Sequence, residues 1–165
     1  MPWIEVHPAG PENEHALATL ENAAWALELR ARPRTGVDEP FFGPHRQPGD
    51  VLVAVEEPDG VILGHVDLDR QFTAPSNAHV LRLLNLLVSP AARGQGIGAK
   101  LLAAAVEEAR VRGARKVEVR ALATNATAVD LYTRAGFAEE ARFHHEFALP
   151  DGRLVDDVWF ARWIG

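Results

Sequence analysis

Residues 83–112 constrain the fold of this 165-residue chain more than any other part of it. An apolar run is followed by a short turn, by three glycines at alternate positions (Gly94, Gly96 and Gly98), and then by an Ala- and Leu-rich segment. Glycine permits positive φ and close approach of the backbone, and the first N–H groups of a helix carry partial positive charge. No acidic residue occurs in 93–106. The stretch therefore predicts a strand, a loop and a helix whose start is a cradle for phosphate or pyrophosphate.

The glycine pattern alone leaves two other interpretations open. A Walker A motif needs Gly-Lys followed by Ser or Thr, and Lys100 is preceded by Ala99 and followed by Leu. The dinucleotide fingerprint G-x-G-x-x-A is satisfied by Gly94, Gly96 and Ala99, but that fingerprint follows its strand almost directly, whereas residues 89–93 intervene here. A glycine-rich turn that serves only close helix packing is the second interpretation.

Hydrophobic periodicity predicts one mixed α/β domain, 1–165, with an antiparallel first half. Prolines and glycines interrupt the pattern after the first helix, which predicts a long ordered loop of the lid or binding type. The expected order is strand 3–7, helix 12–30, loop 33–49, strands 51–56, 61–72 and 79–88, helix 96–112, strand 116–122, helix 126–135 and strands 137–149 and 153–163.

Composition excludes several classes of function. The chain has no cysteine, which removes disulfides, thiolate metal sites and a cysteine nucleophile. Its net charge of −6 and pI near 5.6 disfavour a nucleic-acid partner, because phosphate binding needs a basic excess. No run of about 18 apolar residues predicts a membrane span, and the N-terminus lacks a signal-peptide pattern. A cytoplasmic protein without a membrane partner is therefore expected.

Histidines are frequent enough that a metal site has to be considered. His65 and Asp67 share a strand face, but two ligands are too few for a metal centre. The adjacent His144 and His145 are expected to point to opposite faces of their strand. We therefore expect no metal, while a role of His65, His79 or His144 as a base at the acceptor site stays open.

A second motif follows the strand at 116–122. Asn125 is a good helix N-cap, and Tyr132 lies two turns later on nearly the same face, with the small Ala128 between them. Such a face can line a linear ligand. The alternative is that Tyr132 is an ordinary, partly buried helix aromatic.

Together the two motifs resemble the GCN5-related N-acetyltransferase (GNAT) family. The sequence RGQGIG at 93–98 is similar to its R/Q-x-x-G-x-G/A acetyl-coenzyme A signature, and 125–137 resembles its N-x-x-A-x-x-L-Y-x-x-x-G-F segment. The tail from 151 to 162 is similar, less specifically, to the branch that acts on amino acids and other small amines. The resemblance implies a mostly antiparallel sheet of about six or seven strands flanked by helices, with the coenzyme in a V-shaped splay between the two central strands. The acceptor side would be about 1–78 and the coenzyme side about 79–165.

The resemblance also implies roles for single residues, with acetyl-CoA as cosubstrate. A backbone N–H in 86–88 would polarise the thioester carbonyl, with Asn85 beside it as a substrate contact. Tyr132 would protonate the departing thiolate, because an ordinary tyrosine, with a pKa of about 10, still holds its proton at neutral pH. Direct attack by an amine is expected in a chain without cysteine. The coenzyme-binding residues would be Leu86, Leu87, Val88, Arg93, Gly94, Gln95, Gly96, Ile97, Gly98, Ala99, Asn125 and Tyr132.

The general base and the acceptor site are less defined. Glu118 resembles a position where some relatives carry an active carboxylate; alternatively it faces solvent, paired with Arg120 or Arg115. Phe41 and Phe42 in the proline-rich loop either form a wall over the acceptor or anchor the loop on the core.

The leading hypothesis is direct acetyl transfer to a primary amine of a small molecule, such as an amino acid, a polyamine-like amine or an amine antibiotic. Three alternatives stay open: acetylation of a protein N-terminus or lysine, a non-catalytic coenzyme A sensor, and a nicotinamide-dinucleotide oxidoreductase. A homodimer is a further option, because the strand around Trp159 is apolar.

Overall fold

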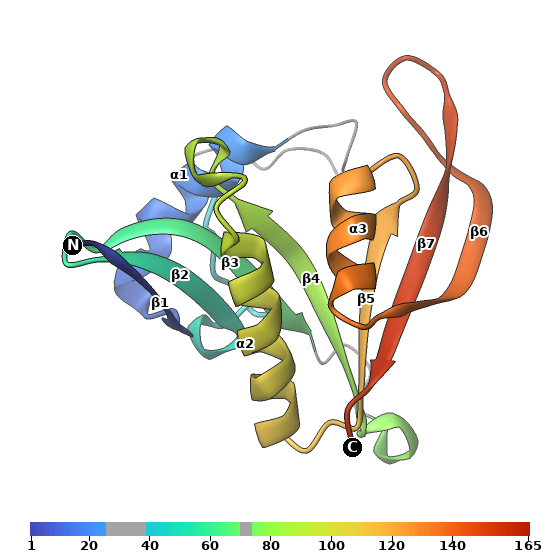
Figure 1. Cartoon of the computed structure of the whole chain (residues 1–165), viewed down its shortest axis with the longest axis horizontal. Coiled ribbons are helices and arrows are strands. Elements are labelled where there is room, and N and C mark those ends of the chain that lie inside the picture. The colour runs from blue at the N-terminus through green and yellow to red at the C-terminus, as the bar shows by residue number, and fades with distance from the viewer. Residues whose placement is uncertain (26–38, 70–73) are drawn as a thin grey trace.

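The computed structural model of the chain describes residues 1–25, 39–69 and 74–165 (Figure 1). Its strands join one sheet in the order β1-β2-β3-β4-β5-β7-β6, and every neighbouring pair except β4–β5 is antiparallel. The mixed, mostly antiparallel sheet flanked by helices is therefore confirmed. The elements are β1 (Trp3–Pro8), α1 (Glu14–Ala24), β2 (Val51–Glu57), β3 (Val61–Asp69), β4 (Val80–Val88), α2 (Ile97–Val111), β5 (Lys116–Leu122), α3 (Ala126–Arg134), β6 (Ala138–Ala148) and β7 (Leu154–Trp163).

The predicted order of elements is confirmed wherever the structure describes the chain. The strand expected at 116–122 has these bounds, and the helix expected at 96–112 is α2. The helix predicted at 12–30 is shorter than expected: α1 begins at Glu14 and ends at Ala24, because the backbone is already extended at Trp25 (φ −70°, ψ 131°). Residues 26–30 of that prediction, the beginning of the loop 33–49 and the end of the strand 61–72 lie outside the described residues.

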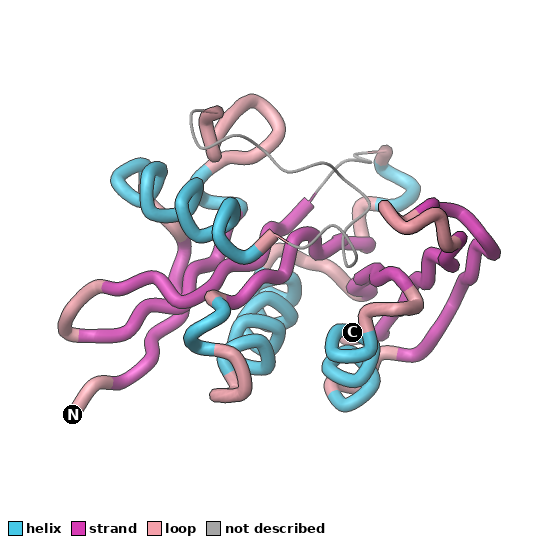
Figure 2. Tube along the Cα trace, turned by 90° about the horizontal axis from the view of Figure 1, so that it is seen from above, coloured by secondary structure: helices cyan, strands magenta, loops and turns pink. Residues whose placement is uncertain are grey.

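The helices cover both faces of the sheet. Figure 2 shows α1 on one face and α2 and α3 on the other. Ile97, Leu101 and Ala105 recur at helical spacing and form the buried face of α2. This face packs with Val117 of β5 and Val158 of β7 in one large apolar cluster. Fully burying a Leu or Val side chain stabilises a fold by about 1.5–3 kcal/mol, so this cluster holds α2 and α3 against the sheet.

The parallel pair β4–β5 is joined at one end only. Register pairs run from Val80–Lys116 to Arg82–Glu118 and then stop, although both strands continue. Figure 1 shows the two strands diverging beyond this point. The V-shaped gap predicted between the two central strands is therefore present.

A β-bulge interrupts β4 beside this gap. His65 of β3 pairs with Leu87, and Asp67 pairs with Leu84, so that two residues of β4 lie opposite a single residue of β3. Asn85 sits in the bulge with φ 51°, in the left-handed region that asparagine tolerates better than most residues.

The bulge reverses the face of the sheet to which the side chains of β4 point. Before it, Leu81 and Leu83 pack into the cluster on the α2 face. After it, Leu87 packs against Leu20 and Ala24 of α1, on the opposite face. An uninterrupted strand would have kept all three leucines on one face, because side chains alternate with period two.

Candidate active site

The glycine loop forms an exposed and uncapped start to α2. Gly94 and Gly96 have φ values of 77° and 79°, which side-chain-bearing residues rarely adopt. Gly96 is the N-cap, so no side chain accepts from the first N–H groups of the helix, which also lack acceptors within it. Arg93 is exposed beside them. This arrangement suits a polyanionic ligand.

Gly98 has a different role in the same loop. A Cβ on it would lie 3.4 Å from Cδ2 of Leu131 and 3.8 Å from Cγ2 of Val88. The start of α2 therefore lies against both α3 and the end of β4. The structure thus brings together the two sequence motifs and the strand 86–88, which the sequence analysis assigned to one coenzyme site.

On α3 the predicted cap is present: Oδ1 of Asn125 accepts a hydrogen bond from the N–H of Ala128 at 3.2 Å. The ring of Tyr132 is buried and lies 6.2 Å from the ring of Phe137 and 5.8 Å from that of Phe160. The ring is thus part of the apolar core, as the alternative interpretation expected, and only the hydroxyl is left for the catalytic role expected from the sequence.

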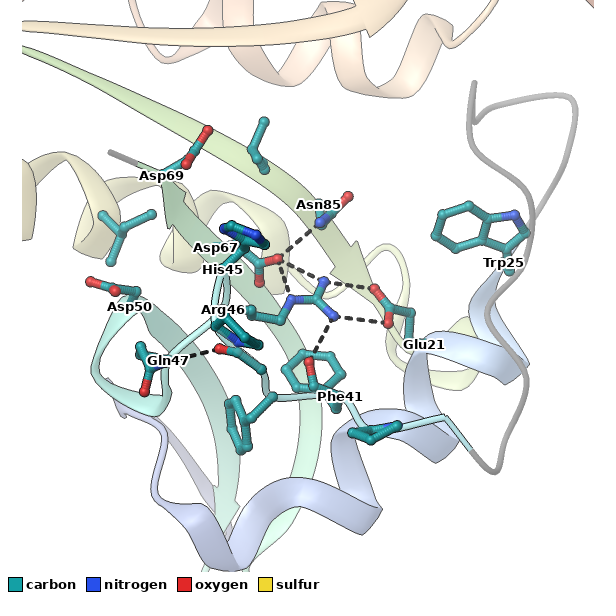
Figure 3. Close-up of a pocket in the computed structure, with 16 residues that line it drawn as sticks. Glu21, Trp25, Phe41, His45, Arg46, Gln47, Asp50, Asp67, Asp69 and Asn85 are labelled. Carbon is teal, nitrogen blue, oxygen red and sulfur yellow. Dashed lines mark hydrogen bonds and ion pairs between the residues drawn. The ribbon is translucent and has the colours of Figure 1, made fainter. Parts of the chain in front are cut away.

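A second site lies on the α1 face of the sheet, at the β4 bulge. A pocket of about 700 Å³ is enclosed by α1, the loop 40–47, β3 and β4, and includes Leu84 and Asn85 (Figure 3). Phe41 and Phe42 line this pocket, and so does Asp69. The substrate residues expected from the sequence are therefore brought together here.

Arg46 forms the centre of the polar wall of this pocket. Its Nη2 and Nη1 donate to the two carboxylate oxygens of Glu21 at 2.9 and 3.1 Å. Its Nε and Nη2 lie 2.8 and 2.7 Å from Oδ2 of Asp67, and its guanidinium lies 3.9 Å from the centre of the Phe41 ring. The three charged side chains are 8–20% exposed, so their charges are compensated mainly by one another.

Asp67 collects donors from two strands. Asn85 donates from Nδ2 to Oδ2 at 2.9 Å, and His65 lies with Nδ1 3.1 Å from Oδ1. Burial alone would raise the pKa of Asp67, but the hydrogen bond from His65, the positive charge of Arg46 and the amide of Asn85 outweigh it and hold the pKa below its ordinary value. Because Oδ1 of Asp67 is a carboxylate acceptor, its contact with His65 is a hydrogen bond when the imidazole carries its proton on Nδ1, and Nε2 of His65 is buried without a hydrogen-bond partner in the described part of the chain.

Phe41 combines the two roles proposed for it. It is 4% exposed and packs with Leu17 and Val51 on the core, and it also lines the pocket. The backbone N–H groups of Phe41 and Phe42 donate to the carboxylate of Glu14, which ties the loop to α1. The loop is therefore anchored on the core and forms a wall at the same time.

Glu118 lies elsewhere and has other partners than expected. Its carboxylate is 3.0 Å from Nη2 of Arg82 and 3.2 Å from Nζ of Lys116. The predicted pairing with Arg120 or Arg115 is wrong: Arg120 pairs with a carboxylate of β7 instead. Glu118 stands at the closed end of the gap, and it is not part of the pocket lining.

Sequence reasoning missed Arg46, Glu21 and Asp69 and treated Asp67 only as a metal ligand. A signal was present in β3, where His65, Asp67 and Asp69 occupy every second position and so share one strand face, with apolar residues between them on the other face. Polar side chains repeated on one face of an otherwise apolar strand indicate a polar site on that face.

The other histidines do not assemble a metal site. In the described ranges no three His, Cys, Asp or Glu side chains stand close enough to hold a metal ion. Asp156 is contacted by Nδ1 of His144 at 3.1 Å and by the backbone N–H of His145 at 3.0 Å.

None of the helices in the described ranges is long and apolar enough to cross a membrane.

Comparison with known proteins agrees with this geometry. Residues 16–137 match the model of the acetyltransferase (GNAT) family. An aminoglycoside N(6')-acetyltransferase type 1 from Klebsiella aerogenes is 35% identical over 135 residues, which are 75% of this chain and 88% of the relative. A thialysine N-epsilon-acetyltransferase from Sus scrofa is 31% identical over 112 residues, 67% of this chain and 65% of the relative.

Solved structures share the fold at lower identity. The structure of yncA from Salmonella typhimurium with its cofactor acetyl-CoA has a TM-score of 0.77 and 20% identity, covering 99% of this chain and 95% of that one. The family match spans both the glycine loop and the Asn125–Tyr132 face. The chain therefore belongs to the acetyltransferase (GNAT) family and is an acetyl-CoA-dependent N-acetyltransferase.

Proposed function

We propose that the enzyme transfers the acetyl group of acetyl-CoA directly to a primary amine of a small cationic molecule bound in the pocket at the β4 bulge. The excess of carboxylates in that pocket carries this proposal. Glu21, Asp67 and Asp69 line it, while Arg46 supplies one guanidinium against them. A cleft of one sign of charge attracts ligands of the opposite sign. Two relatives act, by their names, on an aminoglycoside and on thialysine, both of which carry more than one amine.

The coenzyme would bind on the other side of β4. The backbone N–H groups of 93–99 would hold the pyrophosphate, and Asn125 would contact the coenzyme at the start of α3. The backbone of 86–88 would pair with the pantetheine arm in the gap, where β5 no longer occupies the edge of β4. The thioester would then lie beside the bulge, between the two sites.

In this reaction the protein would stabilise the charge on the carbonyl oxygen and transfer protons to the sulfur and from the amine. The amine nitrogen forms a bond to the acetyl carbon, the carbon–sulfur bond breaks, and a backbone N–H of 86–88 stabilises the charge on the carbonyl oxygen. The hydroxyl of Tyr132 donates its proton to the departing sulfur. The amine loses its proton to a carboxylate of the pocket or to water, because Glu118, the base that the sequence indicates, lies outside the pocket lining and pairs with Arg82 and Lys116.

An acceptor panel followed by release of free thiol tests this function. Cadaverine and its monoamine counterpart pentylamine form a matched pair that differs only in the second charge. We expect kcat/KM to be higher for cadaverine by about tenfold or more, equivalent to about 1.4 kcal/mol, and this preference to shrink as salt is added.

The same panel includes peptides with a free N-terminus and with lysine. Faster turnover of a peptide than of any small amine would contradict the proposal in favour of protein acetylation. Tight binding of acetyl-CoA with no turnover on any amine would favour a coenzyme A sensor.

A further inference from the structure

We propose that Asp67 and Arg46 position the β4 bulge for acetyl transfer by holding the side chain of Asn85, which lies in the bulge itself. This inference rests on the proposed function, which places the thioester carbonyl beside 86–88. It assigns a task to buried charges that the acetyl-transfer steps do not use.

The bulge needs an external support. Asn85 has φ 51° and lies in the interval where the β3–β4 register shifts between His65 and Asp67. A residue in the left-handed region costs about 1–3 kcal/mol and persists where its surroundings fix it. The register shift also takes this part of β4 out of the regular ladder with β3. The β3–β4 ladder is therefore interrupted at the bulge, where the side-chain contact of Asn85 adds a further support.

Asp67 supplies that support. Its Oδ2 accepts from Nδ2 of Asn85 at 2.9 Å and from Arg46 at 2.7 and 2.8 Å, and its Oδ1 faces His65. Both oxygens are thus fixed by donors: Oδ2 by Asn85 and Arg46 of the pocket lining, and Oδ1 by the fully buried His65. A carboxylate whose own position is fixed in this way can orient the amide that donates to it.

Arg46 connects this support to the acceptor side. Its guanidinium binds Glu21 of α1 with two hydrogen bonds and stacks on Phe41, while it also binds Asp67 (Figure 3). The loop 40–47, α1, β3 and the bulge are therefore linked through one side chain. A shift of the acceptor loop would reach the bulge through Arg46 and Asp67.

Such a role should appear in kcat rather than in the affinity for acetyl-CoA. Donors to a developing oxyanion act only when they are held close to the productive geometry, and a misplacement of about 1 Å can cost up to about 100-fold in rate. The pyrophosphate cradle in 93–99 is a separate part of the proposed coenzyme site, so we expect most of the affinity for acetyl-CoA to remain when the bulge next to 86–88 shifts.

The test compares Asp67→Asn, Asn85→Gly and the double variant Asp67→Asn/Asn85→Gly. Asp67→Asn weakens the acceptor of the Asn85 amide, and Asn85→Gly removes that amide while leaving a residue that adopts positive φ easily. Each is expected to lower kcat by about 10- to 100-fold, with a much smaller change in the Kd of acetyl-CoA measured by calorimetry. Because both substitutions act on one contact, the loss in the double variant is expected to be smaller than the product of the two single losses.

Arg142→Gln is the matched control. Arg142 bridges the carboxylates of Glu139 and Asp156 as Arg46 bridges those of the pocket, but it lines no part of that pocket. Arg46→Gln is expected to lower kcat, and Arg142→Gln is expected to leave it unchanged. Loss of an ion pair in general is thereby separated from loss of this one.

Amide hydrogen exchange provides a readout that does not need turnover. The amides of 85–88 are expected to exchange faster in Asp67→Asn and Asn85→Gly than in the unaltered protein, and at an unchanged rate in Arg142→Gln. If the unaltered protein acetylates no amine, the proposed function fails, and exchange at the bulge still decides whether Asp67 holds it. Unchanged exchange in Asp67→Asn, or full activity in Asn85→Gly, would overturn the positioning role. Fully multiplicative losses in the double variant would overturn it as well.

Discussion

At the scale of single residues, the ring of Tyr132 has a structural role and its hydroxyl has the proposed chemical role. Its ring packs against Phe137 and Phe160 in the core, whereas the proposed proton donation depends on one oxygen atom. A substitution that deletes only this oxygen therefore tests the chemistry without opening a cavity.

Tyr132→Phe should retain the fold and the affinity for acetyl-CoA, and lower kcat by about 10²- to 10⁴-fold, the usual contribution of a general acid. Steady-state kinetics and calorimetry on the same preparation measure both quantities, and thermal melting checks the fold. An unchanged kcat would remove Tyr132 from the mechanism, and a lost affinity for acetyl-CoA would make it a binding residue.

At the scale of elements, the two ends of α2 differ in what they offer a ligand. Gly96 at its start and Gly113 after its end have φ values of 79° and 86°, and a Cβ at either would meet no atom within 4 Å. A side chain would therefore strain the backbone to a similar extent at both ends. Only the start of the helix presents N–H groups to an anion.

Gly96→Val is expected to abolish measurable binding of acetyl-CoA by calorimetry, while Gly113→Val retains it. Both variants should melt at similarly lowered temperatures, because both force a β-branched residue to positive φ. Equal affinities in the two variants would contradict the assignment of the cradle to the start of α2.

The elements differ in how far the sequence predicts them. The strands, α2 and the α3 motif depend on local signals, such as the glycines around Gly96, the N-cap Asn125 and the alternation in β5, and these predictions are confirmed. The cluster of Arg46, Asp67 and Asn85 depends on contacts between residues that are far apart in the chain. Such contacts follow from the register of β3 and β4 and from the bulge, which no local pattern encodes. The sequence therefore indicates polar positions in β3 but does not predict that these three side chains contact one another.

At the scale of the whole molecule, ionised carboxylates make the stability of the fold depend on pH. Asp156 accepts hydrogen bonds from the backbone of His145 and from Arg142, which lower its pKa from 3.8 to about 2. A carboxylate with a lowered pKa in the folded state contributes stability that is present above its unfolded pKa and is lost as the pH falls through its folded pKa. Asp67 acts in the same direction.

Urea unfolding should therefore show stability falling as the pH is lowered from about 4 to about 2, because the unfolded chain binds more protons there. In Asp156→Asn the fall should be shallower, while stability at neutral pH is lower. Asp59→Asn, in the exposed β2–β3 turn, serves as the control and should keep the slope of the unaltered protein. An equally steep fall in Asp156→Asn would contradict this origin of the pH dependence.

The short pairing between β4 and β5 has a mechanical consequence. In a continuous sheet, every hydrogen bond along a strand pair resists bending about that line, but here only the register pairs at one end do so. Beyond them the two half-sheets are held together by the apolar cluster on the α2 face, which includes Leu83 of β4, Val119 of β5 and Leu101 of α2. Close-packed side chains transmit a change of volume to their neighbours. The opening between the strands is therefore set by the volumes of buried side chains, and repacking that cluster changes its width without altering any residue that lines it.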